Sequence, residues 1–192
     1  MRGLEQIPWL YDLGLDVAEA LGLRRWREWL VRGARGRALD LGTGTGRNLL
    51  HLPPGSRAVA IDPRRENLAR ARRRGPAVPL VLARAEALPF RDGAFETVLG
   101  GLVLCSVEDP AAALGEIRRV LAPEGTLRLL EHVRAGGAAG ELQDLVQPAW
   151  TRLTGGCHPN RETERAVEAA GFHVDPVSRR ARGVLRRLTA RR

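Results

Sequence analysis

The chain has 192 residues and a formal net charge of +9, and all of its 31 Lys and Arg positions are arginine. This length fits one domain that buries roughly 70% of the surface of its unfolded chain, without covalent staples. The two cysteines, Cys105 and Cys157, form no C-x-x-C pair and are too few for a disulfide framework, so we expect neither a disulfide scaffold nor a bound metal.

The N-terminal residues predict one or two helices over residues 10–30, before the first strand. Their apolar positions are Leu10, Leu13, Val17, Leu21, Trp26 and Leu30. Acidic residues interrupt this pattern and exclude an ordinary signal peptide and a membrane-spanning helix; they are Glu5, Asp12, Asp16 and Glu19. We therefore expect a cytoplasmic protein in which residues 1–34 form helices that cover the functional site.

Residues 38–47, ALDLGTGTGR, predict a short buried strand over 38–41, a glycine-rich turn and a helix over 47–52. Glycine has no Cβ, so its backbone can turn tightly and approach a ligand closely. Such a loop after a parallel strand is where open α/β sheets hold nucleotides. A dinucleotide fingerprint would place glycine at position 47, which is Arg47, so this loop is of another nucleotide-binding type or an ordinary tight turn.

A second apolar strand over residues 58–61 ends at Asp62, twenty residues after Gly42. An acid at this offset is placed to accept hydrogen bonds from both hydroxyls of a ribose. Asp62 also precedes a helix that starts near Arg64, where an aspartate often acts as a cap. Because the loop and the acid occur together, we favour the ribose interpretation.

Three further strands are expected at 80–82, 97–99 and 126–130, with helices at 66–73 and 111–121 between them. The helix at 111–121 has Leu114, Ile117 and Leu121 on one face. Short apolar strands that alternate with helices predict an α/β fold with a central, mostly parallel sheet and helices on both faces.

Residues 135–170 are expected to form a helical insertion. A helix over 141–153 has an apolar stripe that we expect to pack in the core: Leu142, Leu145, Val146, Ala149, Trp150 and Leu153. Pro148 should kink or break this helix near Gln147. A helix over 161–170 has Asn160 as its expected N-cap, and Gly171 should close it.

The segment 179–192 contains seven arginines and no acid. Such an arginine-rich C-terminal tail indicates either binding to nucleic acid or anionic lipid, or a solvated terminal hairpin. Aromatic residues are absent from it, so no base-stacking surface is apparent, and we favour the hairpin.

Three motifs together resemble the type 11 family of class I methyltransferases, which use S-adenosylmethionine (SAM), over about residues 8–180. They are the G-x-G-x-G loop after Asp40, the acid Asp62, and residues 84–96 (RAEALPFRDGAFE). The resemblance implies a single Rossmann-like domain over 1–192, with SAM as cofactor and S-adenosylhomocysteine as product. It implies cofactor contacts at Asp40, Gly42, Thr43, Gly44, Gly46, Asp62, Pro63, Ala85, Glu86, Gly101 and Leu102.

The chain departs from the family pattern at three positions. Arg84 stands where an aspartate usually accepts from the adenine amino group, so that contact is in question. Thr43 replaces a common cysteine, and Glu124 replaces a usual glycine. Segments 102–107, 130–134 and 155–163 are similar to the branch that includes thiol methyltransferases.

The four histidines are the candidates for a general base. His132 follows the fifth strand and His158 lies in a loop, so either is a candidate catalytic residue, or each is a hydrogen-bond partner of the backbone. His51 and His173 are expected to be structural. Cys157 is either a reactive thiol or a buried structural cysteine, and we favour the second.

The resemblance implies a SAM-dependent methyltransferase that acts on a small-molecule acceptor, a thiol or another apolar nucleophile. We expect the acceptor pocket between Tyr11, residues 102–104 and the helix at 142–150. The alternatives are an RNA or lipid methyltransferase that uses the basic tail, and a SAM-binding module without catalysis. The N-P-P-[YF] motif of base-methylating enzymes is absent, so nucleic acid is not the expected partner.

Overall fold

The computed structural model describes residue 16 and residues 18–75 and 77–192. Within these residues eight strands form one sheet in the order β3-β2-β1-β4-β5-β8-β6, and β7 pairs with β8. The strands are β1 Arg37–Leu41, β2 Arg57–Asp62, β3 Leu80–Leu82, β4 Phe95–Gly101, β5 Leu121–His132, β6 His173–Val174, β7 Arg180–Arg182 and β8 Leu185–Arg191.

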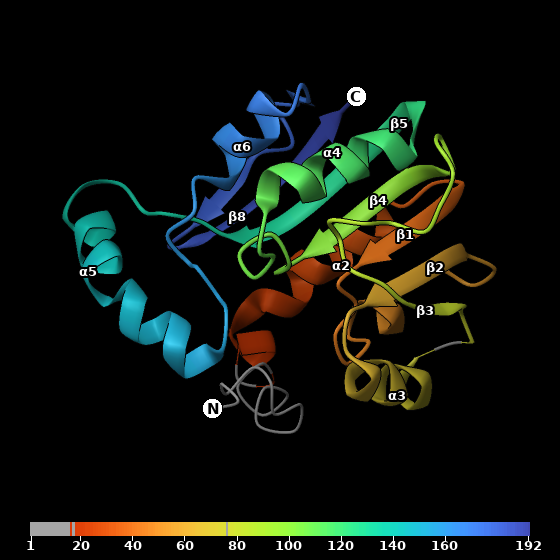
Figure 1. Cartoon of the computed structure of the whole chain (residues 1–192), viewed down its shortest axis with the longest axis horizontal. Helices are drawn as coiled ribbons and strands as arrows, with labels where there is room; N and C mark the ends of the chain where they lie inside the picture. Colours follow the sequence, from red (N-terminus) through yellow and green to blue (C-terminus); the bar gives the residue numbers. More distant parts are fainter. Residues whose placement is uncertain (1–15, 17, 76) are drawn as a thin grey trace.

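The helical elements lie between and before these strands (Figure 1). They are a π-helical turn η2 Glu19–Leu23, α2 Arg24–Arg32, a 3-10 turn η3 Asn48–His51, α3 Arg65–Arg74, α4 Pro110–Val120, α5 Gly137–Thr154 and α6 Thr163–Ala169. The five expected strands are all present, and four of them are longer than predicted. Residues 10–15 and 17 of the expected N-terminal helices lie outside the described residues, as does Tyr11.

The strands β3, β2, β1, β4 and β5 pair in parallel, and β8 joins β5 antiparallel. Figure 1 shows α4 and α6 over one face of the sheet and α2 on the other. The sequence dictates this two-sided cover because consecutive strand residues point to opposite faces. Val98 of β4 packs in the cluster that includes α4, whereas its neighbour Leu99 packs against α2. The predicted α/β fold is confirmed.

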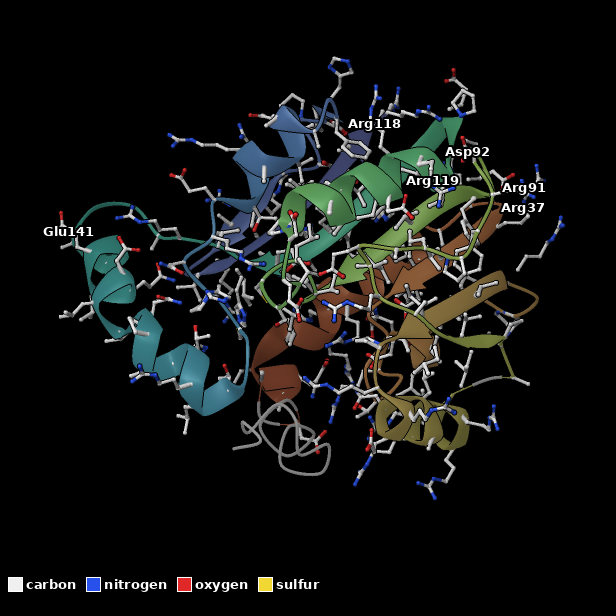
Figure 2. The ribbon with its side chains drawn as sticks, viewed as in Figure 1. Arg37, Arg91, Asp92, Arg118, Arg119 and Glu141 are labelled. Carbon is white, nitrogen blue, oxygen red and sulfur yellow. The ribbon has the colours of Figure 1, made fainter. Side chains whose placement is uncertain are left out.

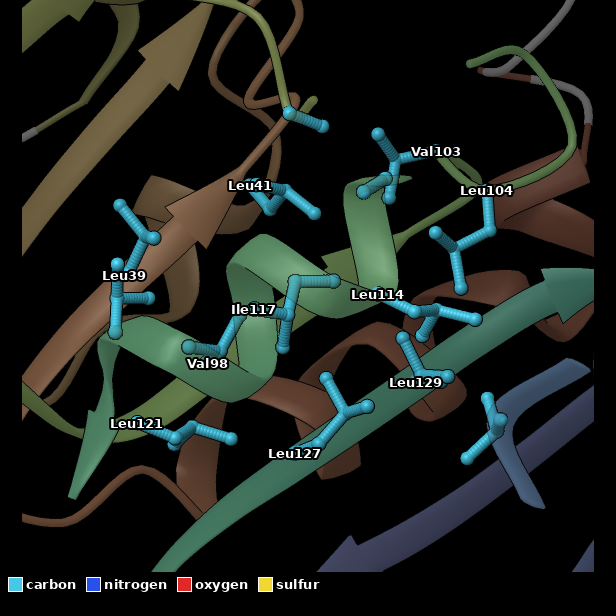
Figure 3. Packing of buried hydrophobic residues seen from close by; sticks show 14 of the residues in the cluster. Leu39, Leu41, Val98, Val103, Leu104, Leu114, Ile117, Leu121, Leu127 and Leu129 are labelled. Atoms are coloured by element: carbon cyan, nitrogen blue, oxygen red, sulfur yellow. The ribbon is translucent and has the colours of Figure 1, made fainter. Parts of the chain in front are cut away.

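The main core lies under α4 (Figure 3). Leu114 and Ile117 are fully buried on one face of this helix and pack with Leu127 and Leu129 of β5. Asp109 caps the helix, because its carboxylate accepts from the amides of Ala111 and Ala112. The core contacts and the cap together hold α4 in place on the sheet.

Arg119 at the end of α4 fastens the loop that follows β3 (Figure 2). Its guanidinium donates to the carboxylate of Asp92 at 2.8 Å and to the carbonyls of Phe90 and Leu88. Glu116, one turn earlier, accepts from the amide of Leu88 at 2.7 Å. Residues 88–92 are therefore held on the helix by charge-assisted hydrogen bonds.

The apolar stripe of α5 does not lie in the core, so that expectation is wrong. Leu145 is 77% exposed, and Leu142, Val146, Trp150 and Leu153 are also exposed. Figure 1 shows the reason: α5 stands away from the sheet. The helix also continues through Pro148 without the expected break, since the carbonyl that proline leaves unpaired belongs to exposed Asp144, where water can reach it.

Two further expectations about the C-terminal half need correction. The N-cap position of α6 is Glu162 and not Asn160, whose side chain instead donates to Asp144 at 2.9 Å. The arginine-rich segment contains the expected hairpin, since β7 pairs antiparallel with β8, but it is no solvated tail, because β8 also pairs with β5 from Leu185 to Arg191. One of its arginines packs on an aromatic residue: the Arg187 guanidinium lies over the ring of Trp29 at 4.6 Å.

Among the described residues, no helix is both long and apolar enough to cross a membrane.

Candidate functional site

A cavity of about 560 Å³ lies at the carboxyl ends of β1, β2 and β4. This volume is in the range of small-molecule and cofactor sites. The predicted residues that line it are Gly42, Gly44, Asp62, Pro63, Ala85, Glu86, Leu102 and His158. The cavity therefore brings together the glycine loop, the acid after β2 and the loop that follows α5.

The glycines of the loop are required for different physical reasons. Gly42 has φ +59°, and a Cβ there would lie 2.4 Å from Cγ2 of Val103. Gly46 has φ +85°, and its Cβ would lie 2.8 Å from Cα of Ala71 in α3. Gly44 has φ +56°, but its Cβ would meet nothing closer than 4.0 Å. Gly44 thus keeps the cavity open, whereas Gly42 and Gly46 allow close packing of the loop.

Asp62 links the glycine loop to the residues at the start of α3 and is not the N-cap of that helix, which is Arg64. Its Oδ2 accepts from the backbone N–H of Gly44 at 2.9 Å, and its Oδ1 accepts from the amide of Arg64 and from Asn67. Burial raises the pKa of Asp62, and these hydrogen bonds oppose the rise. The carboxylate therefore ties the glycine loop to the start of α3 while it borders the cavity.

Asp40 lies behind the loop and is not part of the cavity lining. Its Oδ1 accepts from Asn48 at 2.6 Å, and Asn48 in turn accepts from Arg27. Burial raises the pKa of Asp40 to about 6, although the hydrogen bond from Asn48 and the charge of Arg27 favour the carboxylate. Three other predicted cofactor residues, Thr43, Gly46 and Gly101, also stand outside the lining.

The segment after β3 forms another wall of the cavity. Ala85 is buried there, and Arg84 pairs with Glu108 at 2.7 Å. The Oε1 of Glu86 accepts from the backbone N–H of Glu108 at 2.9 Å. Arg84 thus binds a neighbouring acid at the position where the family usually has an aspartate, which leaves the backbone of this segment to meet a ligand.

The wall after β4 is held by a residue whose role sequence reasoning missed, Glu131. Its buried carboxylate accepts from the amides of Val103, Leu104 and Cys105 at 3.0, 3.0 and 3.3 Å. Burial raises the pKa of Glu131 to about 7, and these amides oppose the rise. Leu102, which starts this loop, has φ +60° and lines the cavity. An acid inside an otherwise apolar strand end was the signal that marked Glu131.

His158 lies in the cavity lining, and its neighbours fix its tautomer. The Thr151 hydroxyl donates to the carbonyl of Cys157, so it must accept from the side-chain nitrogen of Gln147. That nitrogen lies 2.8 Å from Nδ1 of His158, so Nδ1 is the acceptor. Burial lowers the pKa of His158. The neutral ring therefore carries its proton on Nε2.

The other histidine candidate, His132, lies elsewhere, beside two buried cysteines. One ligand atom from each of Cys105, His132 and Cys157 lies within 4.8 Å of the others. Hydrogen bonds from the Cys105 thiol and from His132 lower the pKa of Cys157, and the same bond raises the pKa of Cys105. Cys157 is buried, as expected.

The acceptor side of the cavity differs in part from the expected pocket. Leu102 and Val103 line it, as do Gly155 and Gly156 after α5, whereas none of the described residues of α5 itself does. Arg161 also lines it and donates to the carbonyl of Leu104. Sequence reasoning missed Arg161, which stood among many arginines without a distinguishing motif.

Comparison with known proteins places this site in a family. Residues 39–129 match the family described as "Methyltransferase domain" (Methyltransf_11). The human thiol S-methyltransferase TMT1B is 36% identical over 153 residues, which cover 74% of this chain and 63% of that protein. A demethylmenaquinone methyltransferase of Thermus thermophilus is 44% identical over 118 residues, which cover 56% of this chain and 54% of that protein. The chain thus spans less than two thirds of these relatives.

A solved structure shows the same fold. It is that of a SAM-dependent methyltransferase, possibly a histamine N-methyltransferase by its description, from Thermotoga maritima. It superposes with a TM-score of 0.67 at 21% identity and covers 86% of both chains. The sheet order, the glycine loop with Asp62 and these matches agree: residues 39–129 match the type 11 methyltransferase domain, and the chain has the fold of the SAM-dependent methyltransferases to which it is similar.

Proposed function

We propose that the protein transfers the methyl group of SAM to a small apolar acceptor, and that thiols are the acceptor class. The observation that carries this proposal is the lining of one cavity. The glycine loop and Asp62 border it on one side, and Gly156, His158 and Arg161 border it on another. A methyl donor and a small acceptor can therefore meet in one cavity.

On the donor side, Gly42, Thr43 and Gly44 hold the methionine part of SAM, and Asp62 accepts from the ribose hydroxyls. Pro63, Ala85, Glu86 and Leu102 border the adenosine. Asp40, Thr43, Gly46 and Gly101 lie outside the lining, so Asp40, Gly46 and Gly101 act through the shape of the loop, and Thr43 acts through its place between the two lining glycines. A carboxylate that already accepts from backbone amides is oriented for the ribose before the ligand arrives.

On the acceptor side, the reaction asks little of a general base when the acceptor is a thiol. A free thiol has a pKa near ~8.5 and ionises readily, and the sulfonium of SAM already activates the methyl carbon. The positive charge of Arg161 and the Nε2–H of His158 favour a thiolate in the cavity. Of the two histidine candidates, the cavity lining favours His158, because His132 lies outside it.

The names of the relatives at about one third identity, thiol S-methyltransferases, support the same acceptor class. Nucleic acid is disfavoured because arginines of the C-terminal segment have partners within the chain, such as Glu164 for Arg179 and Leu121 for Arg192. We place the activity in the cytoplasm, since Cys105 and Cys157 are free thiols, as expected in a reducing compartment.

The test is a methyl-transfer assay with isotope-labelled SAM against thiols, phenols, lipids and RNA, with products identified by mass spectrometry. We expect label in thioethers. Label in RNA or lipid alone would show that thiols are not the acceptor class. SAM binding without transfer to any class would indicate a binding module and contradict the proposal.

A further inference from the structure

The residues Cys105, His132 and Cys157 form a cluster outside the cavity lining. The three residues come from three separate elements: the loop after β4, the last position of β5, and the loop after α5. Both cysteines are 1% exposed, and neither forms a disulfide. One sulfur or nitrogen atom from each lies within 4.8 Å of the other two.

The backbone of each cysteine is held by bonds that do not involve its sulfur. The carbonyl of Cys105 accepts from the amide of His158 at 2.7 Å, and its amide donates to Glu131. The carbonyl of Cys157 accepts from the Thr151 hydroxyl at 2.9 Å, and its amide donates to Thr154. The side chains are therefore presented to one point by a preformed frame, which is what a metal site requires.

We propose that Cys105, His132 and Cys157 bind a zinc ion. In a tetrahedral site with Zn–S bonds of about 2.3 Å, two sulfur ligands are separated by about 3.8 Å, so only a small contraction of the cluster is needed. Two thiolates and a neutral imidazole are ligands that suit Zn²⁺, and the two negative charges of the thiolates balance the ion. Buried thiolates without such a cation are costly.

The fourth coordination position is open in this proposal. Within the described residues, no fourth histidine, cysteine or acid joins the group, and the carboxylate of Glu131 is engaged by backbone amides. Three protein ligands and one exchangeable position are the pattern of zinc sites that bind water or substrate. Ser106 and Gly156, the chain neighbours of the two cysteines, line the SAM cavity. The cluster therefore lies one residue behind the cavity wall, and in this proposal its open position faces that wall.

A zinc ion at this place would give the proposed methyl transfer a site that binds the acceptor, and this consequence rests on the proposed function. An acceptor thiol that takes the fourth position releases its proton to solvent and remains as a metal-bound thiolate. Its sulfur lone pair then forms the new S–CH₃ bond as the sulfonium–methyl bond breaks, which yields a thioether and S-adenosylhomocysteine.

The test is a competition titration of Zn²⁺ between a chromophoric chelator and the full chain, purified without an affinity tag and freed of metal. We expect one ion per chain, and a rise in the thermal midpoint with Zn²⁺. Cys105→Ser, Cys157→Ser and His132→Gln should each weaken binding by about 10²-fold or more, whereas His173→Gln, an exposed histidine outside the cluster, should not.

Absence of stoichiometric binding, or equal binding by all four variants, overturns the proposal. Cobalt substitution tests the open position: adding 2-mercaptoethanol to the Co²⁺-loaded chain should intensify the sulfur-to-cobalt charge-transfer band. An unchanged band overturns the open position. SAM affinity, measured by calorimetry on the metal-free chain, separates the two proposals, because failed zinc binding with intact SAM binding leaves the proposed function standing.

Discussion

The carboxylate of Asp62 accepts a hydrogen bond from the backbone N–H of Gly44 at 2.9 Å. This bond joins the end of β2 to the glycine loop that follows β1, and these are two of the three segments that carry the family resemblance. The acid and the loop thus form one unit before any ligand binds. A change in either segment should alter the other.

The first prediction tests whether Asp62 binds the ribose itself. Asp62→Ala should weaken S-adenosylhomocysteine binding by roughly 1.5–3 kcal/mol for each charge-assisted hydrogen bond lost. Because the substitution also frees Gly44, calorimetry should be repeated with the 2′,3′-dideoxy analogue. The wild-type chain should lose affinity for the analogue, whereas the variant should bind both ligands alike. An equal loss in both chains would show that Asp62 only shapes the loop.

The second prediction separates two glycines of the loop. Gly42→Ala places a Cβ 2.4 Å from the side chain of Val103, so it should lower the free energy of unfolding by about 1–3 kcal/mol more than Gly44→Ala does. Both changes share the cost of a positive φ, so each serves as the control of the other. Gly44→Ala directs its methyl group into the cavity and should mainly reduce SAM affinity. Denaturant unfolding and calorimetry on both variants measure this, and the reverse ranking would contradict it.

The third prediction concerns the pH dependence of stability that comes from Asp40. Its pKa rises from 3.8 in the unfolded chain to about 6 in the fold, so the folded state binds more protons between these values. The stabilisation of the folded state by protonation of Asp40 is fully present below about pH 4 and is lost as the pH rises through about 6. The difference in unfolding free energy between the wild type and Asp40→Asn should therefore shift against the wild type over this range, and a constant difference would refute the assignment.

The fourth prediction distinguishes a hydrogen-bond donor from a general base at His158. If His158 acts as a hydrogen-bond donor, turnover should be nearly unchanged in His158→Asn, because asparagine keeps an N–H group. His158→Ala should lower turnover by about tenfold, the equivalent of one hydrogen bond. SAM affinity should be nearly unchanged in both variants. A loss of about 10²-fold or more in both would instead identify His158 as the base.

The sequence predicted the parallel half of the sheet because its strands are short apolar runs, each bounded by turns. Glycine spacing and the acid at Asp62 predicted one side of the cavity for the same reason: the signal is local. The apolar stripe of α5 was misplaced, since periodicity reports an amphipathic face and not its partner. The roles of Glu131 and of the cluster around Cys157 depend on contacts between residues far apart in the chain; an acid in an apolar strand end marks Glu131 as unusual, but no local pattern reveals its partners.

The strand β8 illustrates the same limit. Its arginine-rich sequence has the composition of a solvated segment, yet it pairs with β5 along seven positions from Leu185 to Arg191. Trp26 and Trp29, more than 150 residues earlier in the chain, provide the rings on which Arg187 lies. These aromatic faces cover the guanidinium of Arg187 and help to accommodate it on the sheet.

Methyl transfer to thiols tests the account most directly. The purified chain should be incubated with labelled SAM and an aromatic or aliphatic thiol, beside Asp62→Ala and His173→Gln as matched variants. The account predicts that the wild type and His173→Gln each form a labelled thioether and S-adenosylhomocysteine in a one-to-one ratio, and with the same yield. Asp62→Ala should give a strongly reduced yield of both products. Tight SAM binding by the wild-type chain without any thioether would contradict it.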